Sequence, residues 1–143
     1  MIEKITRVMV ADDHQILREG IVSLLADEQG LLVVGGAANG QEAIDRVPVY
    51  RPDVLLLDIV MPVMGGIEAA RWIRDKHPQT EIVILTAHHN ETYQRQAFDA
   101  GARGYLTKEC SSEDLMVAIR HAARGDYFLS GAAGRDLVAE YVS

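Results

Sequence analysis

The stretch Val54-Leu55-Leu56-Leu57-Asp58 decides the fold that the sequence predicts. Four consecutive apolar residues run directly into a carboxylate, and turn-forming residues follow at Met61-Pro62 and Gly65-Gly66. A short apolar run that is closed by turn residues is typical of a strand buried on both faces. Asp58 therefore follows a buried strand, at the point where the chain leaves the core.

Four further apolar runs predict strands, and amphipathic segments between them predict helices. The other strands are expected over residues 4–11, 31–34, 81–85 and 104–107. Helices are expected over residues 14–27, 43–47, 67–76, 90–100 and 111–124, with Pro48 and Pro52 closing the second. Five strands that alternate with five helices predict an α/β fold, a doubly wound, five-stranded parallel sheet with helices on both faces.

Polar residues stand at the carboxyl ends of four of these strands. They are Asp12 and Asp13 after the first strand, Asp58 after the third, Thr86 at the end of the fourth and Lys108 after the fifth. In doubly wound folds the functional crevice lies outside the carboxyl ends of the strands, at a switch in strand order. We therefore expect these side chains to meet in one crevice. The second strand ends in Gly35-Gly36 and brings no functional group, which suits an edge strand.

Asp12, Asp13 and Asp58 would bring up to three negative charges together. Like charges in a partly buried site repel and raise one another's pKa, so the cluster needs a cation. Mg²⁺ prefers oxygen ligands in an octahedron and retains some of its waters, which suits carboxylates and a carbonyl. No histidine or thiol is expected in this cluster, which argues against zinc.

Four segments carry a family resemblance: Val10-Ala11-Asp12-Asp13-His14, Leu55-Leu56-Leu57-Asp58-Ile59-Val60-Met61-Pro62, Ile84-Leu85-Thr86-Ala87 and Gly104-Tyr105-Leu106-Thr107-Lys108. Together they resemble the receiver domains of two-component response regulators, from about Ile5 to Gly125. Residues 101–106 and 122–130 look like the NarL/FixJ (LuxR-type) subgroup, whose members usually continue into a helix-turn-helix DNA-binding domain. The resemblance implies a flavodoxin-like sheet with strand order 2-1-3-4-5.

The resemblance implies a role for each acid of the crevice. Asp58 is expected to be the phosphoacceptor, a nucleophile toward a histidine-kinase phosphohistidine or a small acyl phosphate. Asp12 and Asp13 are expected to hold Mg²⁺ together with Asp58 and the backbone carbonyl of Val60, and Mn²⁺ is the alternative ion. The metal site would therefore surround the nucleophile.

Roles are also implied for residues after the fourth strand and in the fifth. Lys108 is expected to pair with the phosphoryl oxygens, and Thr86 and Ala87 to contact the same group. Thr86 would turn its hydroxyl toward the phosphoryl group, and Tyr105 would change rotamer in concert. A carboxylate is a weak nucleophile, so catalysis must come from positioning and from cations that neutralise the phosphoryl oxygens.

Two positions depart from the usual family pattern. Gly65 precedes Gly66 where the family often has aspartate, so we expect one loop contact to be absent. Glu109 follows Lys108 in a neighbourhood where proline is common, so we expect a different peptide geometry there. Neither position touches the phosphoryl chemistry directly.

The composition of this 143-residue chain limits the kinds of partner and environment that we expect for it. Its net charge of -7 argues against a nucleic-acid-binding surface, so DNA contact is expected only through a C-terminal domain outside this chain. The single cysteine, Cys110, suits a reducing cytoplasm. No apolar run is long enough for a membrane span, and no secretory signal is recognised at the start.

The expected organisation is a receiver domain over residues 1–126, followed by a linker or short helix over residues 127–143. The expected partners are a sensor histidine kinase and, in a homodimer, a second copy of the chain. The expected function is a phosphorylation-dependent switch rather than an enzyme, with transcription as its output.

Other interpretations stay open. A stand-alone receiver would act by protein–protein contact alone. An aspartate-nucleophile phosphatase usually has its nucleophile after the first strand and a second aspartate two residues on, whereas Asp12 and Asp13 are adjacent. A nucleotide- or flavin-binding domain needs a glycine-rich phosphate loop, and Gly35-Gly36 lacks its spacing. A receiver-like domain that signals without phosphate would normally have a degraded acid pocket.

Overall fold

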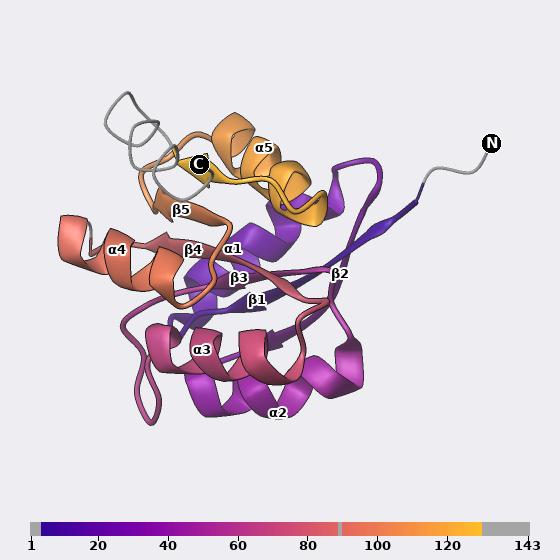
Figure 1. The fold of residues 1–143 in the computed structure, drawn as a ribbon. Coiled ribbons are helices and arrows are strands. Elements are labelled where there is room, and N and C mark those ends of the chain that lie inside the picture. Colours follow the sequence, from indigo (N-terminus) through magenta and orange to yellow (C-terminus); the bar gives the residue numbers. More distant parts are fainter. Residues whose placement is uncertain (1–3, 89, 130–143) are drawn as a thin grey trace.

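The computed structural model describes residues 4–88 and 90–129. A six-stranded parallel sheet in the order β2-β1-β3-β4-β5-β6 forms its centre (Figure 1). The first five strands confirm the predicted order, and the sixth extends the sheet beyond β5. The strands are β1 (Thr6–Ala11), β2 (Leu31–Ala37), β3 (Val54–Leu57), β4 (Glu81–Thr86), β5 (Gly104–Thr107) and β6 (Phe128–Leu129).

Five helices cover the two faces of the sheet, as predicted. Two helices, α1 and α5, pack on one face, and α2, α3 and α4 pack on the other (Figure 1). Their bounds are α1 (Gln15–Ala26), α2 (Gly40–Tyr50), α3 (Gly66–Lys76), α4 (Glu91–Asp99) and α5 (Ser112–Ala123). Within the two described ranges, no helix combines the length and the apolar character that crossing a bilayer requires.

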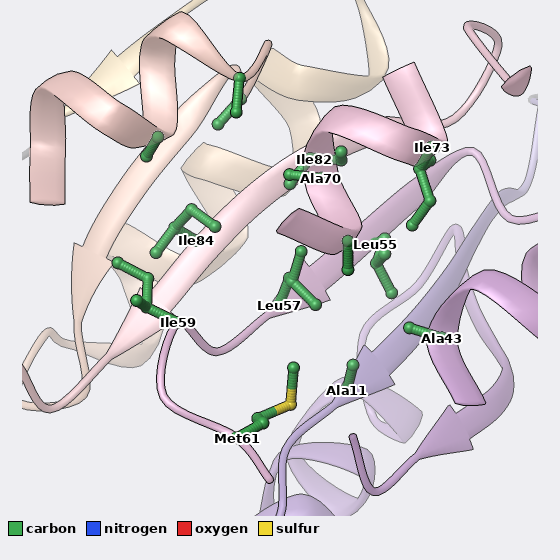
Figure 2. Close-up of a cluster of buried hydrophobic side chains, with 14 of the residues drawn as sticks. Ala11, Ala43, Leu55, Leu57, Ile59, Met61, Ala70, Ile73, Ile82 and Ile84 are labelled. Carbon is green, nitrogen blue, oxygen red and sulfur yellow. The ribbon is translucent and has the colours of Figure 1, made fainter. Parts of the chain in front are cut away.

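The central strand β3 is buried along its whole length, as its apolar run predicts. Side chains alternate between the two faces of a strand. Leu55 and Leu57 accordingly enter the core under α2, α3 and α4, and Leu56 enters the core under α1 and α5. Figure 2 shows Leu57 in the first of these cores, with Ile84 of β4 close by. Two-sided burial holds the β3 backbone, and therefore the start of the following loop, in one place.

The helix ends follow capping rules that the sequence indicates. Asn90 accepts a hydrogen bond from the Tyr93 backbone at the start of α4, and Ser111 accepts one from the Asp114 backbone at the start of α5. Gly101 follows α4 with a φ of 102°, in the left-handed region that glycine tolerates. Local chemistry therefore fixes where α4 and α5 begin and where α4 stops.

The sixth strand was not predicted from the sequence. Phe128 and Leu129 pair in parallel with Gly104 and Tyr105, and the Phe128 N–H donates to the Arg103 carbonyl at 2.8 Å. Two residues are too few to show strand periodicity, so only the tertiary contacts reveal this element. The preceding ring, Tyr127, helps to hold it against the domain. Residues 130–143 of the predicted linker or short helix lie outside the described residues.

Tyr127 joins β6 to helix α4. Its ring lies 5.9 Å from the ring of Phe98 in α4 and 4.7 Å from the guanidinium of Arg103. Arg103 in turn forms a 2.6 Å ion pair with Glu81 at the start of β4. Aromatic and cation–π contacts of this kind each add modest stability. The short strand is therefore anchored by side chains as well as by its backbone.

The predicted boundaries of β2 and α2 were wrong. Strand β2 continues through Gly35 and Gly36 to Ala37, because these residues pair with the end of β1. The missing side chain at Gly35 also leaves room for Tyr50, whose ring a Cβ would approach to 2.7 Å.

Helix α2 begins at Gly40, where Asn39 caps it, rather than at residue 43. Helix α2 continues past Pro48 to Tyr50. The Arg7 guanidinium donates to the Tyr50 carbonyl at 2.6 Å, and this tertiary contact satisfies an acceptor at the end of the helix.

Candidate functional site

The register of the sheet brings two aspartates to neighbouring positions. Ala11 pairs with Leu57, so the next residues, Asp12 and Asp58, leave adjacent parallel strands side by side. The ladder continues one residue further, because the Asp58 N–H donates to the Ala11 carbonyl at 3.1 Å. Only 2% of the Asp12 surface and 3% of the Asp58 surface are exposed. The two carboxylates are therefore held in a buried crevice at the carboxyl edge of the sheet.

Lys108 connects the two buried carboxylates. Its Nζ lies 2.7 Å from Asp12 Oδ2 and 2.9 Å from Asp58 Oδ2. Burial by itself lowers the pKa of the ammonium, but hydrogen bonds to Asp12 and then Asp58 outweigh it, and the pKa of Lys108 lies above its ordinary value. The lysine therefore stays charged and neutralises part of the acid cluster.

Asp58 keeps one oxygen free. Its Oδ1 is buried and has no hydrogen-bond partner within the part of the chain that the structure describes. A buried carboxylate oxygen without a partner is destabilising unless a ligand satisfies it. Asp12, Asp13, His14 and Asp58 each offer one ligand atom, and these atoms lie within 4.8 Å of one another. The unsatisfied oxygen and the carboxylate-rich donor set fit a hard divalent cation such as Mg²⁺.

The expectation that no histidine reaches this cluster was wrong. His14 Nδ1 lies 3.3 Å from Asp12 Oδ1 and 3.2 Å from Asp13 Oδ1. His14 is the residue that directly precedes α1, and its backbone N–H donates to Asp12 Oδ1 at 2.8 Å. This turn brings the imidazole back toward the acids, although most of the His14 side chain is exposed to solvent. Its place immediately after Asp12 and Asp13 was the available sequence signal.

Arg18 is a second residue that the sequence did not single out. Its Nη1 donates to the Asp12 backbone carbonyl at 2.6 Å from the first turns of α1. The side chain of Arg18 passes over β2 at Gly36, where an added Cβ would lie 3.3 Å from Arg18 Cδ. The glycine therefore leaves space for the contact that ties α1 to the Asp12–Asp13 turn.

Gly66 fixes the loop that follows the candidate phosphoacceptor. A Cβ at Gly66 would overlap the backbone carbonyl oxygen of Asp58, so only glycine fits this position. The Gly66 N–H donates to the Ile59 carbonyl at 2.8 Å, which closes the loop between β3 and α3. The start of α3 therefore packs directly against the Asp58 backbone.

Thr86 and Tyr105 are joined through the backbone of His88. Thr86 Oγ1 accepts a 3.1 Å hydrogen bond from the His88 N–H, and the Tyr105 hydroxyl donates to the His88 carbonyl at 3.2 Å. Both side chains are buried, and 1% of Tyr105 is exposed. Burial raises the pKa of Tyr105 to about 12, so its hydroxyl keeps the proton that it donates. The predicted switch residues therefore share one peptide segment.

The remaining predicted residues lie at the rim of the crevice. Val60, two residues after Asp58, and Ala87, directly after Thr86, are exposed. The Lys108 N–H donates to the Thr86 carbonyl at 2.9 Å, which sets the ends of β4 and β5 side by side. The structure thus brings Asp12 and Asp58 into contact with Lys108, and it places Asp13 in the same acid cluster.

Residues 8–120 match the family of response regulator receiver domains, and the chain belongs to this family. It is 35% identical over 135 residues to the transcriptional regulatory protein DegU of Brevibacillus brevis, and 37% identical over 131 residues to the response regulator GacA of Pseudomonas viridiflava. These matches cover 94% and 92% of the chain. Its relatives are response regulators of the LuxR family, as the sequence motifs predict.

Solved structures show the same fold. A LuxR-family two-component response regulator from an Aurantimonas species superposes with a TM-score of 0.86 at 35% identity, over 96% of this chain and 97% of that one. A LuxR-family DNA-binding response regulator from Staphylococcus aureus gives a TM-score of 0.78 at 30% identity, over 83% and 99%. The chain spans 57% of the length of DegU and 61% of that of GacA.

Proposed function

We propose that this domain is a phosphorylation-dependent switch that accepts a phosphoryl group on Asp58. The observation that carries the proposal is the free, buried Oδ1 of Asp58. Asp58 lies in a cluster with two further acids, and Lys108 contacts its other oxygen. An oxygen in this position is available to attack an electrophile, while its partner oxygen is held by the lysine. The crevice combines a nucleophile with cationic stabilisation, as phosphoryl transfer needs.

In the proposed transfer, Asp58 Oδ1 forms a bond to the phosphorus of the donor. The bond from phosphorus to the donor breaks, and a histidine nitrogen or a carboxylate oxygen leaves with the bonding electrons. The product is an acyl phosphate on Asp58. Lys108 stabilises the phosphoryl oxygens through its ammonium group, since its raised pKa keeps it charged.

Asp12, Asp13 and Asp58 would hold Mg²⁺, to which the Val60 carbonyl would be a further ligand. When bound, the ion neutralises negative charge on the phosphoryl oxygens. The chain's own residues position these ligands. Arg18 and the His14 backbone orient Asp12, and Gly66 sets the position of the Asp58 backbone.

Thr86 and Ala87 border the phosphoryl position at the end of β4.

The proposed output is control of transcription through a DNA-binding domain outside this chain. LuxR-family relatives that are described as transcriptional or DNA-binding regulators support this. DegU and GacA both extend beyond the part that this chain matches. The proposed phosphoryl donor is a sensor histidine kinase, and self-association is a proposed response. A receiver that acts by protein contact alone is the alternative.

The test of the phosphoacceptor is intact mass after incubation with Mg²⁺ and acetyl phosphate. The wild type is expected to gain one phosphoryl group, which hydroxylamine removes because it cleaves acyl phosphates. Asp58→Ala is expected to stay unmodified. Asp75→Ala, which removes an exposed acid in the last turn of α3, is the matched control and is expected to label fully. Equal labelling of Asp58→Ala and the wild type would refute the proposal.

The test of the output is a DNA titration at low and moderate salt. Phosphate contacts dominate DNA affinity, and a net charge of -7 opposes them. Residues 1–143 alone are therefore expected not to bind DNA specifically. Tight binding that falls steeply with salt would show that the output function resides in this domain.

A further inference from the structure

His14 adds a nitrogen donor to a site that otherwise consists of oxygens. Its Nδ1 lies within 3.3 Å of the Oδ1 atoms of both Asp12 and Asp13. The side chain is 69% exposed, so no core packing accounts for its orientation toward the acids. One ligand atom from each of these residues and from Asp58 fits within a span of 4.8 Å. The imidazole therefore stands where a bound cation would meet it.

Lys108 leaves one oxygen of each of the two buried aspartates for other partners. Lys108 engages the Oδ2 atoms of Asp12 and Asp58 at 2.7 Å and 2.9 Å. Asp12 Oδ1 already accepts the His14 backbone N–H. The buried Asp58 Oδ1 has no partner among the described residues. That oxygen is a second, independent indication that the site takes a ligand, because a buried carboxylate oxygen needs one.

Nitrogen and oxygen donors together select a different ion from oxygen donors alone. Mg²⁺ prefers oxygen ligands, whereas imidazole binds first-row transition ions well. At a site with both nitrogen and oxygen ligands, first-row transition ions therefore bind more tightly than Mg²⁺. We propose that His14 is a metal ligand that shifts the preference of this site from Mg²⁺ toward Mn²⁺ and other first-row divalent ions. This inference deepens the proposed function and rests on it for its purpose, since the ion would serve the transfer to Asp58.

The first experiment detects the nitrogen directly. Mn²⁺ is added to the whole chain, wild type and His14→Gln, and pulsed electron paramagnetic resonance records electron spin echo modulation. The wild type is expected to show modulation from a directly bound imidazole nitrogen, and His14→Gln is expected to lose it. The proposal is overturned if the wild-type spectrum shows only oxygen ligands, or if the nitrogen modulation persists in the variant.

The second experiment measures selectivity. The Kd of Mn²⁺ is obtained from the signal of the free ion, and the Kd of Mg²⁺ from competition with Mn²⁺. In His14→Ala the Kd of Mn²⁺ is expected to rise about tenfold, while that of Mg²⁺ changes less than about threefold. His88→Ala is the matched control, because His88 is another exposed histidine near this edge of the sheet but lies outside the four-residue cluster.

Each outcome separates this proposal from the proposed function. Equal weakening of both ions in His14→Ala means that the histidine only maintains the turn, and the selectivity proposal fails. Nitrogen modulation in a protein whose Asp58 does not accept phosphate would leave the metal ligand established and refute the switch instead. The spectra and the Kd values require no phosphorylation, so the two results are independent.

Discussion

The Tyr105 hydroxyl donates a hydrogen bond to the backbone carbonyl of His88 across 3.2 Å. The N–H of the same residue donates to Thr86 Oγ1. If the Thr86 hydroxyl moved toward Asp58, the His88 N–H would lose its hydrogen-bond acceptor. The His88 peptide segment could then shift, and its carbonyl is the group to which Tyr105 donates. This connection gives the proposed switch a physical route through one residue of the loop between β4 and α4.

The first prediction concerns the signal carried by Thr86. Thr86→Ala is expected to accept phosphate on Asp58, because Thr86 is neither the nucleophile nor a metal ligand. It is expected to lose most of the phosphate-dependent change in self-association, because the hydroxyl that responds to the phosphoryl charge is missing. Phosphorylation is measured by intact mass and association by analytical ultracentrifugation. Thr86→Ser, which keeps the hydroxyl, is the matched control.

Tyr105→Phe completes this test. It removes the hydrogen bond to His88, keeps the ring in the core, and is expected to lower the free energy of unfolding by about 1 kcal/mol. If Thr86→Ala and Tyr105→Phe both respond to phosphate as fully as the wild type, the signal leaves the site by another route.

The second prediction concerns the ionisation of Tyr105. Burial raises its pKa from 10.0 to about 12 in the folded chain. The unfolded state therefore loses this proton at lower pH, and the stability that the neutral phenol contributes is lost as pH rises from about 10 through 12. Absorbance at 295 nm should show a late titration step from Tyr105. Tyr105→Phe should lack that late step, and an unchanged titration would contradict the burial argument.

The third prediction concerns Lys108. Lys108→Met keeps the aliphatic stem but leaves Asp12 and Asp58 buried without their shared cation. Without divalent ions, the free energy of unfolding is expected to fall by about 3 kcal/mol, a typical loss when one member of a buried ion pair is removed. Urea denaturation measures it. Lys76→Met is the control, because Lys76 forms its ion pair on the surface. Equal losses in the two variants would mean that the buried contacts add no stability.

The fourth prediction concerns the Mg²⁺ site. Ion binding to the native state raises Tm by mass action, and it also relieves repulsion between the carboxylates. The Tm of the wild type is expected to rise as Mg²⁺ is added, and that of Asp13→Asn to respond much less, in differential scanning calorimetry. Asp45→Asn, an exposed acid on α2, is expected to behave as the wild type. Equal responses in all three proteins would place the ion elsewhere.

The fifth prediction compares two glycines. Gly66→Ala is expected to destabilise the fold by about 2 kcal/mol or more, because the added methyl group meets the Asp58 carbonyl and forces the backbone apart. Gly20 lies inside α1 with open space around its Cα, so Gly20→Ala is expected to stabilise by about 0.5–1 kcal/mol. Thermal unfolding of both variants measures the contrast. Similar changes in stability in the two variants would mean that the loop between β3 and α3 accommodates the added methyl group at little cost.

The sequence predicted the first five strands because each apolar run was short, bounded by turn residues and followed by a helical pattern, whereas their order in the sheet was implied by the family resemblance. The pairing of Asp12 with Asp58 followed from the same topology, since parallel strands place their carboxyl ends at one edge. Asn90 and Ser111 showed correctly where two helices begin. These features all arise from interactions within a few residues or from general rules of sheet geometry.

Features that depend on distant contacts or on the exact shape of a turn were missed. Helix α2 passes Pro48, and Arg7, more than forty residues earlier in the chain, donates to the carbonyls at its end. Strand β2 runs through Gly35 because it pairs there with Met9 of β1. The approach of His14 to the acids depends on the turn into α1, which residue type alone does not reveal. Phosphorylation, the bound ion and the roles of Val60 and Ala87 remain predictions.

The short strand β6 has a mechanical consequence. It is an edge strand of two residues, and Leu129 pairs with Tyr105, the residue proposed to move in the switch. Opening of this two-residue pairing would remove one strand neighbour of Tyr105 while β1 to β4 keep all of theirs. The docking of β6 and the position of Tyr105 would therefore depend on each other.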